Sequence, residues 1–130
     1  MAILDHFIVP SHDPNGAAKF LAYVLDVGYG EIGRFSAVFI NDTLTADFAQ
    51  REEFDTHHSC FLVRDEEFDA ILTRLQENKI PYLSGPRGPM DMKFNTAHGG
   101  RNLYWLGPDG HNWEILTVSY ARAATNAAAN

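Results

Sequence analysis

The sequence predicts an α+β fold built from two tandem βαβββ modules. The first observation is a pair of short apolar runs, Leu4–Val9 and Thr56–Val63, which are typical of buried strands. Each run carries a histidine at the matching place, at positions 6 and 58. The second observation is that a helical pattern and then further strand patterns follow each run. Repetition of the same order indicates an internal repeat.

Composition restricts the class of protein and its partners. The chain has 130 residues, of which 45% are hydrophobic and 12% aromatic, which suits one compact unit with a real core. The net charge is −7 and no cluster of Lys or Arg occurs, so the chain would repel phosphate backbones. Nucleic acid is therefore not an expected partner.

The N-terminus and the single cysteine indicate a cytoplasmic protein. Cys60 cannot form an internal disulfide, which fits a reducing compartment. Residues 1–5 lack the basic and apolar regions of a signal peptide. No stretch approaches the ~18 apolar residues of a membrane helix, so no membrane partner is expected.

The first module is expected over residues 1–52. Its first strand covers about Ile3–Val9, and Asp13 and Pro14 are typical of the start of a helix. Gly28 is a plausible left-handed stop for that helix. Its apolar stripe consists of Ala17, Phe20, Leu21 and Val24. Three strands are expected next, at Tyr29–Gly33, Phe35–Ile40 and Leu44–Gln50.

The second module is expected over residues 53–118. A strand at Thr56–Val63 leads to a helix that Asp65 can cap, and a short strand is expected at Ile80–Leu83. The irregular stretch Gly85–Gly100 is typical of a binding loop, or it is a plain connector. The helix stripe is Phe68, Ile71, Leu72 and Leu75, and the closing strands are Asn102–Leu106 and Asn112–Thr117. Residues 119–130 form a tail that is either a frayed helix or disordered.

Two such halves can join into one curved mixed sheet around a central cavity, with the helices outside. Such a cavity is the expected place for a small-molecule ligand. Near the axis relating the halves, matching residues would meet, namely His6 with His58 and Asp47 with Glu114. Two histidines and two carboxylates would suit a divalent metal. The alternative is hydrogen-bonded core histidines and salt bridges of Asp47 with Arg34 or Arg51, and of Glu114 with Arg101.

Three segments carry a resemblance to a known family. They are Leu4-Asp5-His6, His57-His58-Ser59-Cys60-Phe61 and the closing run from Pro108-Asp109-Gly110 to Glu114-Ile115-Leu116. On these motifs the chain resembles the vicinal oxygen chelate superfamily, which includes glyoxalase I, fosfomycin resistance proteins, bleomycin resistance proteins and extradiol dioxygenases. The resemblance covers about Ile3–Thr117 and implies a glyoxalase-like fold.

The resemblance implies a metal site formed by His6, His58 and Glu114. His58 matches the family position, and strand alternation turns its neighbour His57 to the other face. Asp47 falls where glyoxalase I has a fourth ligand, a glutamate. Because Asp is one methylene shorter, it would ligate directly, act through water, act as a base, or be structural. The ion would be Fe, Mn, Ni, Co or Zn.

The function implied is that of a metal-dependent enzyme on a small oxygenated substrate, most simply a glyoxalase I-type lyase or isomerase. The metal would act as a Lewis acid, and Glu114 or Asp47 would move a proton. Alternatives are a non-catalytic binding protein of the bleomycin resistance type and an extradiol-type dioxygenase. A homodimer is expected, with sites built within one chain or shared between two.

Further residues are candidates for binding the substrate. Tyr104 would offer a hydroxyl to a bound anion, and Arg101 and His98 would bind a carboxylate or phosphonate. A solvated or structural role is the alternative for each of the three. His12 and His111 lie beside turns and are expected to face solvent.

Overall fold

The computed structural model describes residues 1–122, which form two compact units. The first unit comprises residues 1–57 together with the turn 107–111, and the second comprises residues 58–106 and 112–122 of the described chain. The module boundaries expected at 52 and 118 stay a prediction. Of the tail expected over 119–130, residues 123–130 lie outside the described part of the chain.

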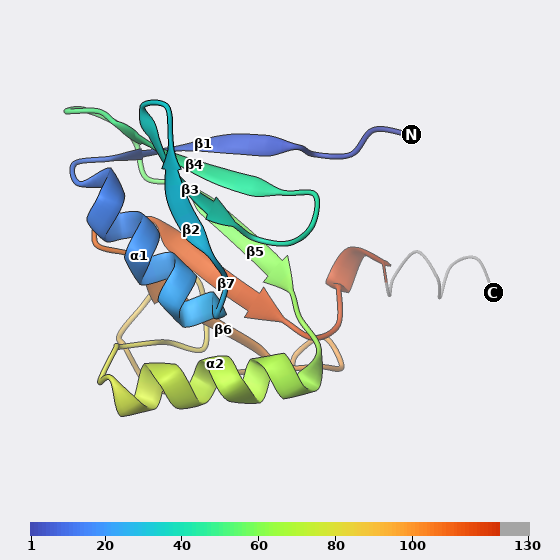
Figure 1. The fold of residues 1–130 in the computed structure, drawn as a ribbon. Helices are drawn as coiled ribbons and strands as arrows, with labels where there is room; N and C mark the ends of the chain where they lie inside the picture. Colours follow the sequence, from blue (N-terminus) through green and yellow to red (C-terminus); the bar gives the residue numbers. More distant parts are fainter. Residues whose placement is uncertain (123–130) are drawn as a thin grey trace. The chain divides into compact units, whose positions relative to one another are not determined.

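The first unit contains a four-stranded mixed sheet and one helix (Figure 1). The sheet has the order β1-β4-β3-β2; β1 and β4 are parallel, and the other pairs are antiparallel. The elements are β1 (His6–Ser11), α1 (Pro14–Leu25), β2 (Tyr29–Ile32), β3 (Phe35–Phe39) and β4 (Thr45–Gln50). The predicted βαβββ order is confirmed here.

Helix α1 begins as the sequence predicts and ends earlier than expected. The carboxylate of Asp13 accepts a hydrogen bond from the Gly16 N–H at 3.2 Å, and Pro14 fills the first turn. The left-handed residue at the end is Asp26, with φ 55°, and not Gly28. Asp tolerates this conformation because its short side chain is small and polar. The carbonyl of Gly28 instead accepts a hydrogen bond from the Phe39 N–H, so Gly28 already lies beside the sheet.

The second unit contains a three-stranded mixed sheet with the order β5-β7-β6. Strands β5 and β7 are parallel, and β6 and β7 are antiparallel. The elements are β5 (His58–Leu62), α2 (Asp65–Glu77), β6 (Asn102–Leu106) and β7 (Asn112–Leu116). One helix with a mixed sheet in each unit confirms the predicted α+β class.

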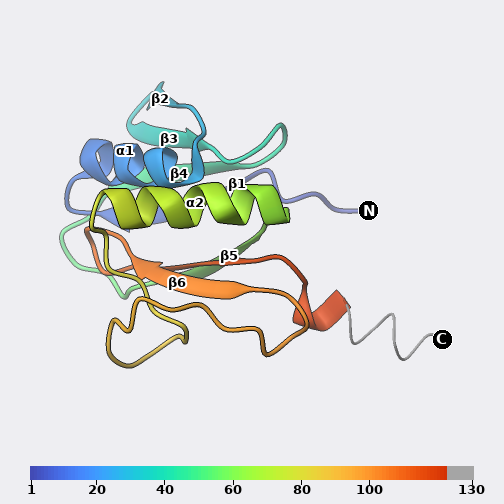
Figure 2. The same cartoon turned by 90° about the horizontal axis from the view of Figure 1, so that it is seen from below.

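The strand expected at Ile80–Leu83 is reduced to a single bridge between Leu83 and Tyr104. Pro81 lacks the N–H that a continuing ladder needs. The connection between α2 and β6 therefore passes beside β6 as an irregular segment (Figure 2). Neither helix within residues 1–122 has the length and apolar character required to cross a membrane.

The strand register places the repeated residues at equivalent positions. In the first sheet Asp47 lies opposite Ile8, two residues beyond His6. In the second sheet Glu114 lies opposite Cys60, two residues beyond His58. Because alternate residues share a face, each sheet presents one histidine and one carboxylate on the same face of two neighbouring parallel strands.

The cap of α1 yields a stability prediction. Asp13→Ala removes the acceptor for the Gly16 N–H, so we expect the free energy of unfolding to fall by about 1 kcal/mol in urea denaturation. Asp42→Ala, in the exposed turn before β4, is the control and is expected to change stability little. Equal effects of the two substitutions would contradict the assigned cap.

Candidate metal centre

Glu114 is a buried carboxylate on the central strand of the second sheet. Its residue is 7% exposed, and it lies between the buried Trp113 and Ile115. The Oε1 atom is 3.1 Å from the Nε2 atom of His58, and the Oε2 atom accepts a hydrogen bond from the Asn102 amide at 2.8 Å. A buried carboxylate is costly unless donors or a cation surround it, and these contacts supply that environment.

Two further acidic groups adjoin Glu114. Burial, followed by the negative charge of Glu114 and a hydrogen bond to it, raises the pKa of Tyr104 to about 12. The same causes in the same order raise the pKa of the Cys60 thiol to about 12. Both groups therefore keep their protons at neutral pH and act as hydrogen-bond donors toward Glu114.

His58 has an acceptor at each ring nitrogen. Its Nδ1 atom is 3.1 Å from the carbonyl oxygen of Asn112, and its Nε2 atom faces the Glu114 carboxylate. A neutral imidazole carries only one N–H, and neither a carbonyl nor a carboxylate can donate. A neutral imidazole can therefore donate to only one of these two acceptors at a time. The ring also stacks on Tyr104, with the ring centroids 6.0 Å apart.

His6 and Asp47 lie in the first unit. The Nδ1 atom of His6 is 2.8 Å from a carboxylate oxygen of Asp5, and the side chain is 56% exposed. The hydrogen bond to Asp5, with the charges of Asp5 and Asp47, raises the pKa of His6 despite the opposing effect of desolvation. Asp47 is half-buried on β4.

Each unit thus holds two of the four residues at repeat-related positions. Within either unit, no three His, Cys, Asp or Glu side chains of residues 1–122 form a group that could hold a metal ion. The second unit supplies the pair His58 and Glu114 in direct contact, whereas the first unit supplies His6 and Asp47 without a hydrogen bond between them.

A pocket of about 270 Å³ in the second unit reaches Glu114. Two of the predicted substrate-binding residues, Tyr104 and His98, line it. Asn102, which lines the pocket and contacts Glu114, is not among the residues predicted from the sequence. Strand alternation offered a signal, because Asn102 and Tyr104 are two residues apart on β6 and so share a face. The full lining is Asn95, His98, Asn102, Tyr104, Glu114 and Tyr120.

Arg101 is engaged with helix α2. Its guanidinium donates to Asp69 at 2.6 Å and to Asp65 at 3.0 Å, and it lies over the ring of Phe68 at 4.3 Å. The hydrogen bond to Asp69 is the largest cause of the raised pKa of Arg101. The alternative pairing of Arg101 with Glu114 is therefore wrong, because the acids of α2 already balance this charge.

His111 is buried at 2% exposure, so the expectation that it faces solvent is wrong. Its Nδ1 atom accepts a hydrogen bond from the His57 N–H at 2.9 Å, and its Nε2 atom donates to the Pro10 carbonyl at 2.6 Å. These partners define the neutral tautomer with the proton on Nε2. His57 packs against this ring, with the centroids 5.2 Å apart. His111 therefore anchors the turn 107–111 within the first unit.

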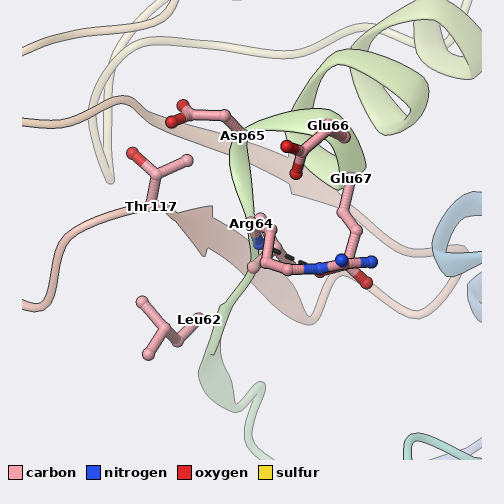
Figure 3. Close-up of a pocket in the computed structure, with 7 residues that line it drawn as sticks. Leu62, Arg64, Asp65, Glu66, Glu67 and Thr117 are labelled. Carbon is pink, nitrogen blue, oxygen red and sulfur yellow. Dashed lines mark hydrogen bonds and ion pairs between the residues drawn. The ribbon is translucent and has the colours of Figure 1, made fainter.

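A larger hollow of about 500 Å³ lies at the N-terminus of α2 (Figure 3). Its acidic residues Asp65, Glu66 and Glu67 stand in the first turn, where the helix dipole favours negative charge. The Glu67 carboxylate accepts hydrogen bonds from the backbone N–H and the Nε of Arg64, at 2.9 and 3.1 Å. None of the predicted site residues lines this hollow, and its side chains of Arg64 and Glu67 are paired with each other.

Comparison with known proteins gives matches among solved structures. No protein-family model matches the sequence, and a search of curated proteins finds no match. Oxidase ChaP-H2 is 36% identical, with 92% of this chain and 95% of that chain covered and a TM-score of 0.84. The fosfomycin resistance protein FosX from Mesorhizobium loti is 20% identical, with 95% and 98% covered and a TM-score of 0.68. A lactoylglutathione lyase from Agrobacterium tumefaciens is 16% identical, with 89% and 92% covered and a TM-score of 0.68. At these lower identities, the fosfomycin resistance protein and the lactoylglutathione lyase show that this chain shares their fold.

Cys60 is an exposed residue, but the raised pKa of its thiol beside Glu114 predicts that it is unreactive. With a pKa of about 12 instead of 9.0, the thiolate fraction is lower by on the order of a thousandfold at about pH 8. We expect alkylation of metal-free protein by iodoacetamide to be slow and to accelerate only at strongly alkaline pH. Glu114→Gln removes the neighbouring charge and should speed the reaction. Rapid alkylation of the folded protein near neutral pH would contradict this environment.

Proposed function

Because this chain belongs to the vicinal oxygen chelate superfamily, we propose that it is a divalent-metal-dependent enzyme that acts on a small oxygenated molecule. Family membership rests on the 36% identity to the oxidase over 92% of the chain. The likeness to FosX and to the lactoylglutathione lyase supports the shared fold. The proposed metal site consists of His58, Glu114 and His6.

The geometry of His58 and Glu114 carries the proposal. The Nε2 atom of His58 and the Oε1 atom of Glu114 lie 3.1 Å apart, so both would be able to hold the same divalent ion. When Nδ1 donates to the Asn112 carbonyl, Nε2 is free of a proton and would be available as a ligand. The contact of Nδ1 with the Asn112 carbonyl is the outer contact that commonly orients a ligating histidine.

His6 is the proposed third ligand. It occupies the position in the first sheet that His58 occupies in the second, and its side chain is 56% exposed. Its hydrogen bond with Asp5 uses Nδ1, which leaves Nε2 for a metal. Asp47, at the position equivalent to Glu114, is a candidate base near His6.

Two histidines and one carboxylate suit Fe²⁺, and Mn, Ni, Co and Zn accept the same donors. The metal would act as a Lewis acid toward neighbouring oxygens of the substrate. The Tyr104 hydroxyl, whose pKa is raised to about 12, would keep its proton and donate it toward Glu114. Glu114 would hold the metal through one carboxylate oxygen. The Asn102 amide donates a hydrogen bond to the other oxygen of that carboxylate and so orients the group.

The name of the 36% identical relative favours oxidation as the reaction class. A glyoxalase I-type lyase or isomerase remains the alternative reaction, and its support is the shared fold alone. Oxygen consumption and hemithioacetal turnover by metal-loaded protein, measured on the same preparation, distinguish the two. Ligand binding without turnover of any substrate would favour a binding protein.

Metal content is the direct test of the site. We expect elemental analysis of protein purified without a metal-affinity step to find near one divalent metal per site. His58→Ala and Glu114→Gln should each lower metal affinity in calorimetry by more than about a hundredfold, because each removes a ligand. His57→Ala is the matched control, since this neighbouring histidine packs on His111.

The variants separate the metal site from the general stability of the fold. Circular dichroism and thermal unfolding of metal-free samples show whether each variant still folds. Retention of the metal by folded His58→Ala and Glu114→Gln would overturn the proposed site. Size-exclusion chromatography tests the predicted homodimer separately. Elution of the protein as a monomer would contradict that prediction.

A further inference from the structure

His111 is a buried histidine whose two ring nitrogens both have backbone partners. It is 2% exposed and is the last residue of the turn 107–111. Its Nδ1 atom accepts the His57 N–H at 2.9 Å, and its Nε2 atom donates to the Pro10 carbonyl at 2.6 Å. The ring of Phe54 stacks on it, with the centroids 5.4 Å apart. Hydrogen bonds at both nitrogens and packing on one face hold the ring in one orientation.

A second hydrogen bond fixes the same turn. The carboxylate of Asp109, whose side chain is 6% exposed, accepts the His12 N–H at 3.0 Å. The turn is thus tied to residues 10 and 12 at two points, through His111 and through Asp109. His111 is therefore a fixed point in the structure and not the end of a mobile loop.

The residues that follow His57 and His111 in the chain both belong to the candidate metal centre. One peptide bond joins His57 to His58, and one joins His111 to Asn112. The Asn112 carbonyl oxygen is 3.1 Å from the Nδ1 of His58. His58 and Asn112 are also the first register pair of the parallel strands β5 and β7. The hydrogen bond of His57 with His111 thus lies one residue before the pair that orients His58.

A side chain takes the place of a carbonyl at this end of the strand pair. At the other end, the Val63 N–H donates to the Leu116 carbonyl at 2.9 Å. Here the His57 N–H donates to the ring of His111 instead. The ends of paired strands open more readily than their middles. The ring therefore limits opening at the end of the pair where the contact with the Nδ1 of His58 is made.

We propose that His111 is a positioning residue that holds the Asn112 carbonyl where it orients the ring of His58. The hydrogen bond from the His57 N–H is the contact through which it acts. When the Asn112 carbonyl accepts the Nδ1 proton of His58, the Nε2 atom is left without a proton beside Glu114. The inference deepens the proposed function, on which it rests for the role of His58 as a ligand.

Two substitutions of His111 separate its two hydrogen bonds. In His111→Asn, the side-chain oxygen takes the place of Nδ1 and can accept the His57 N–H, but the side chain is too short to reach Pro10. In His111→Gln, the amide nitrogen takes the place of Nε2 and can donate to the Pro10 carbonyl, but the His57 N–H loses its acceptor. Each variant loses one hydrogen bond of the same buried side chain, so each is the matched control for the other.

Metal affinity is the first readout. We expect the affinity for Mn²⁺ in calorimetry to fall by about tenfold in His111→Gln and to stay close to the wild-type value in His111→Asn. Thermal unfolding of metal-free samples measures the stability that each variant loses. A residue that only stabilises the turn would lower the affinity in both variants or in neither. Either of those results, or a loss confined to His111→Asn, would overturn the positioning role.

A second readout uses the metal-free protein, so it does not depend on the metal site. In nitrogen-15 NMR, the ring signals of His58 should shift in His111→Gln and keep their wild-type positions in His111→Asn. Unchanged His58 signals in folded His111→Gln would show that the positioning role is wrong. The expected shift in a protein that binds no metal would leave the positioning role and remove the metal enzyme.

The wild-type protein supplies a test that needs no variant. A scalar coupling across the hydrogen bond between the amide nitrogen of His57 and the Nδ1 of His111 should be detectable by NMR. The His57 N–H should also exchange slowly with deuterium, as the N–H groups of paired strands do. Absence of the coupling together with rapid exchange would remove the contact through which His111 acts, and with it the proposal.

Discussion

The burial of the Glu114 carboxylate determines which polar side chains must surround it in the second sheet. Glu114 lies on the middle strand of a three-stranded sheet, where a bare carboxylate would be costly. The fold places donors around it from both neighbouring strands, with His58 on β5 and Asn102 on β6. His58 is itself oriented by the Asn112 carbonyl and faces an acceptor at each nitrogen. His58 and Asn102 thus face the two oxygens of the Glu114 carboxylate from the strands on either side of β7.

The two sheets place a histidine and a carboxylate at equivalent positions, but the two histidines have different partners. Asp47 and Glu114 occupy equivalent register positions, but Asp47 is one methylene shorter. In the first unit His6 forms its hydrogen bond with Asp5, the residue that precedes it. In the second unit His58 contacts the carboxylate of the neighbouring strand. The first unit thus differs from the second in two respects: its strand carboxylate, Asp47, is shorter than Glu114, and an acid, Asp5, lies directly beside its histidine.

Periodicity in the sequence was sufficient to predict the repeat, the α+β class and the histidine–carboxylate positions, because strand alternation and register depend on local pattern. Contacts between distant residues were not predictable in this way. Arg101 pairs with acids of α2, and His111 is buried by bonds to His57 and Pro10. The role of Asn102 depends on which neighbour faces its amide group, which requires side-chain geometry.

The proposed metal site is best tested by anomalous diffraction from crystals grown with Mn²⁺ or Fe²⁺, collected at the absorption edge of the metal. We expect a peak at about 2.0–2.3 Å from both the Nε2 of His58 and the Oε1 of Glu114. The third protein ligand in that map should be the Nε2 of His6, from the same chain or from a second copy. Full metal occupancy elsewhere, with His58 and Glu114 in direct contact and no peak between them, would contradict it.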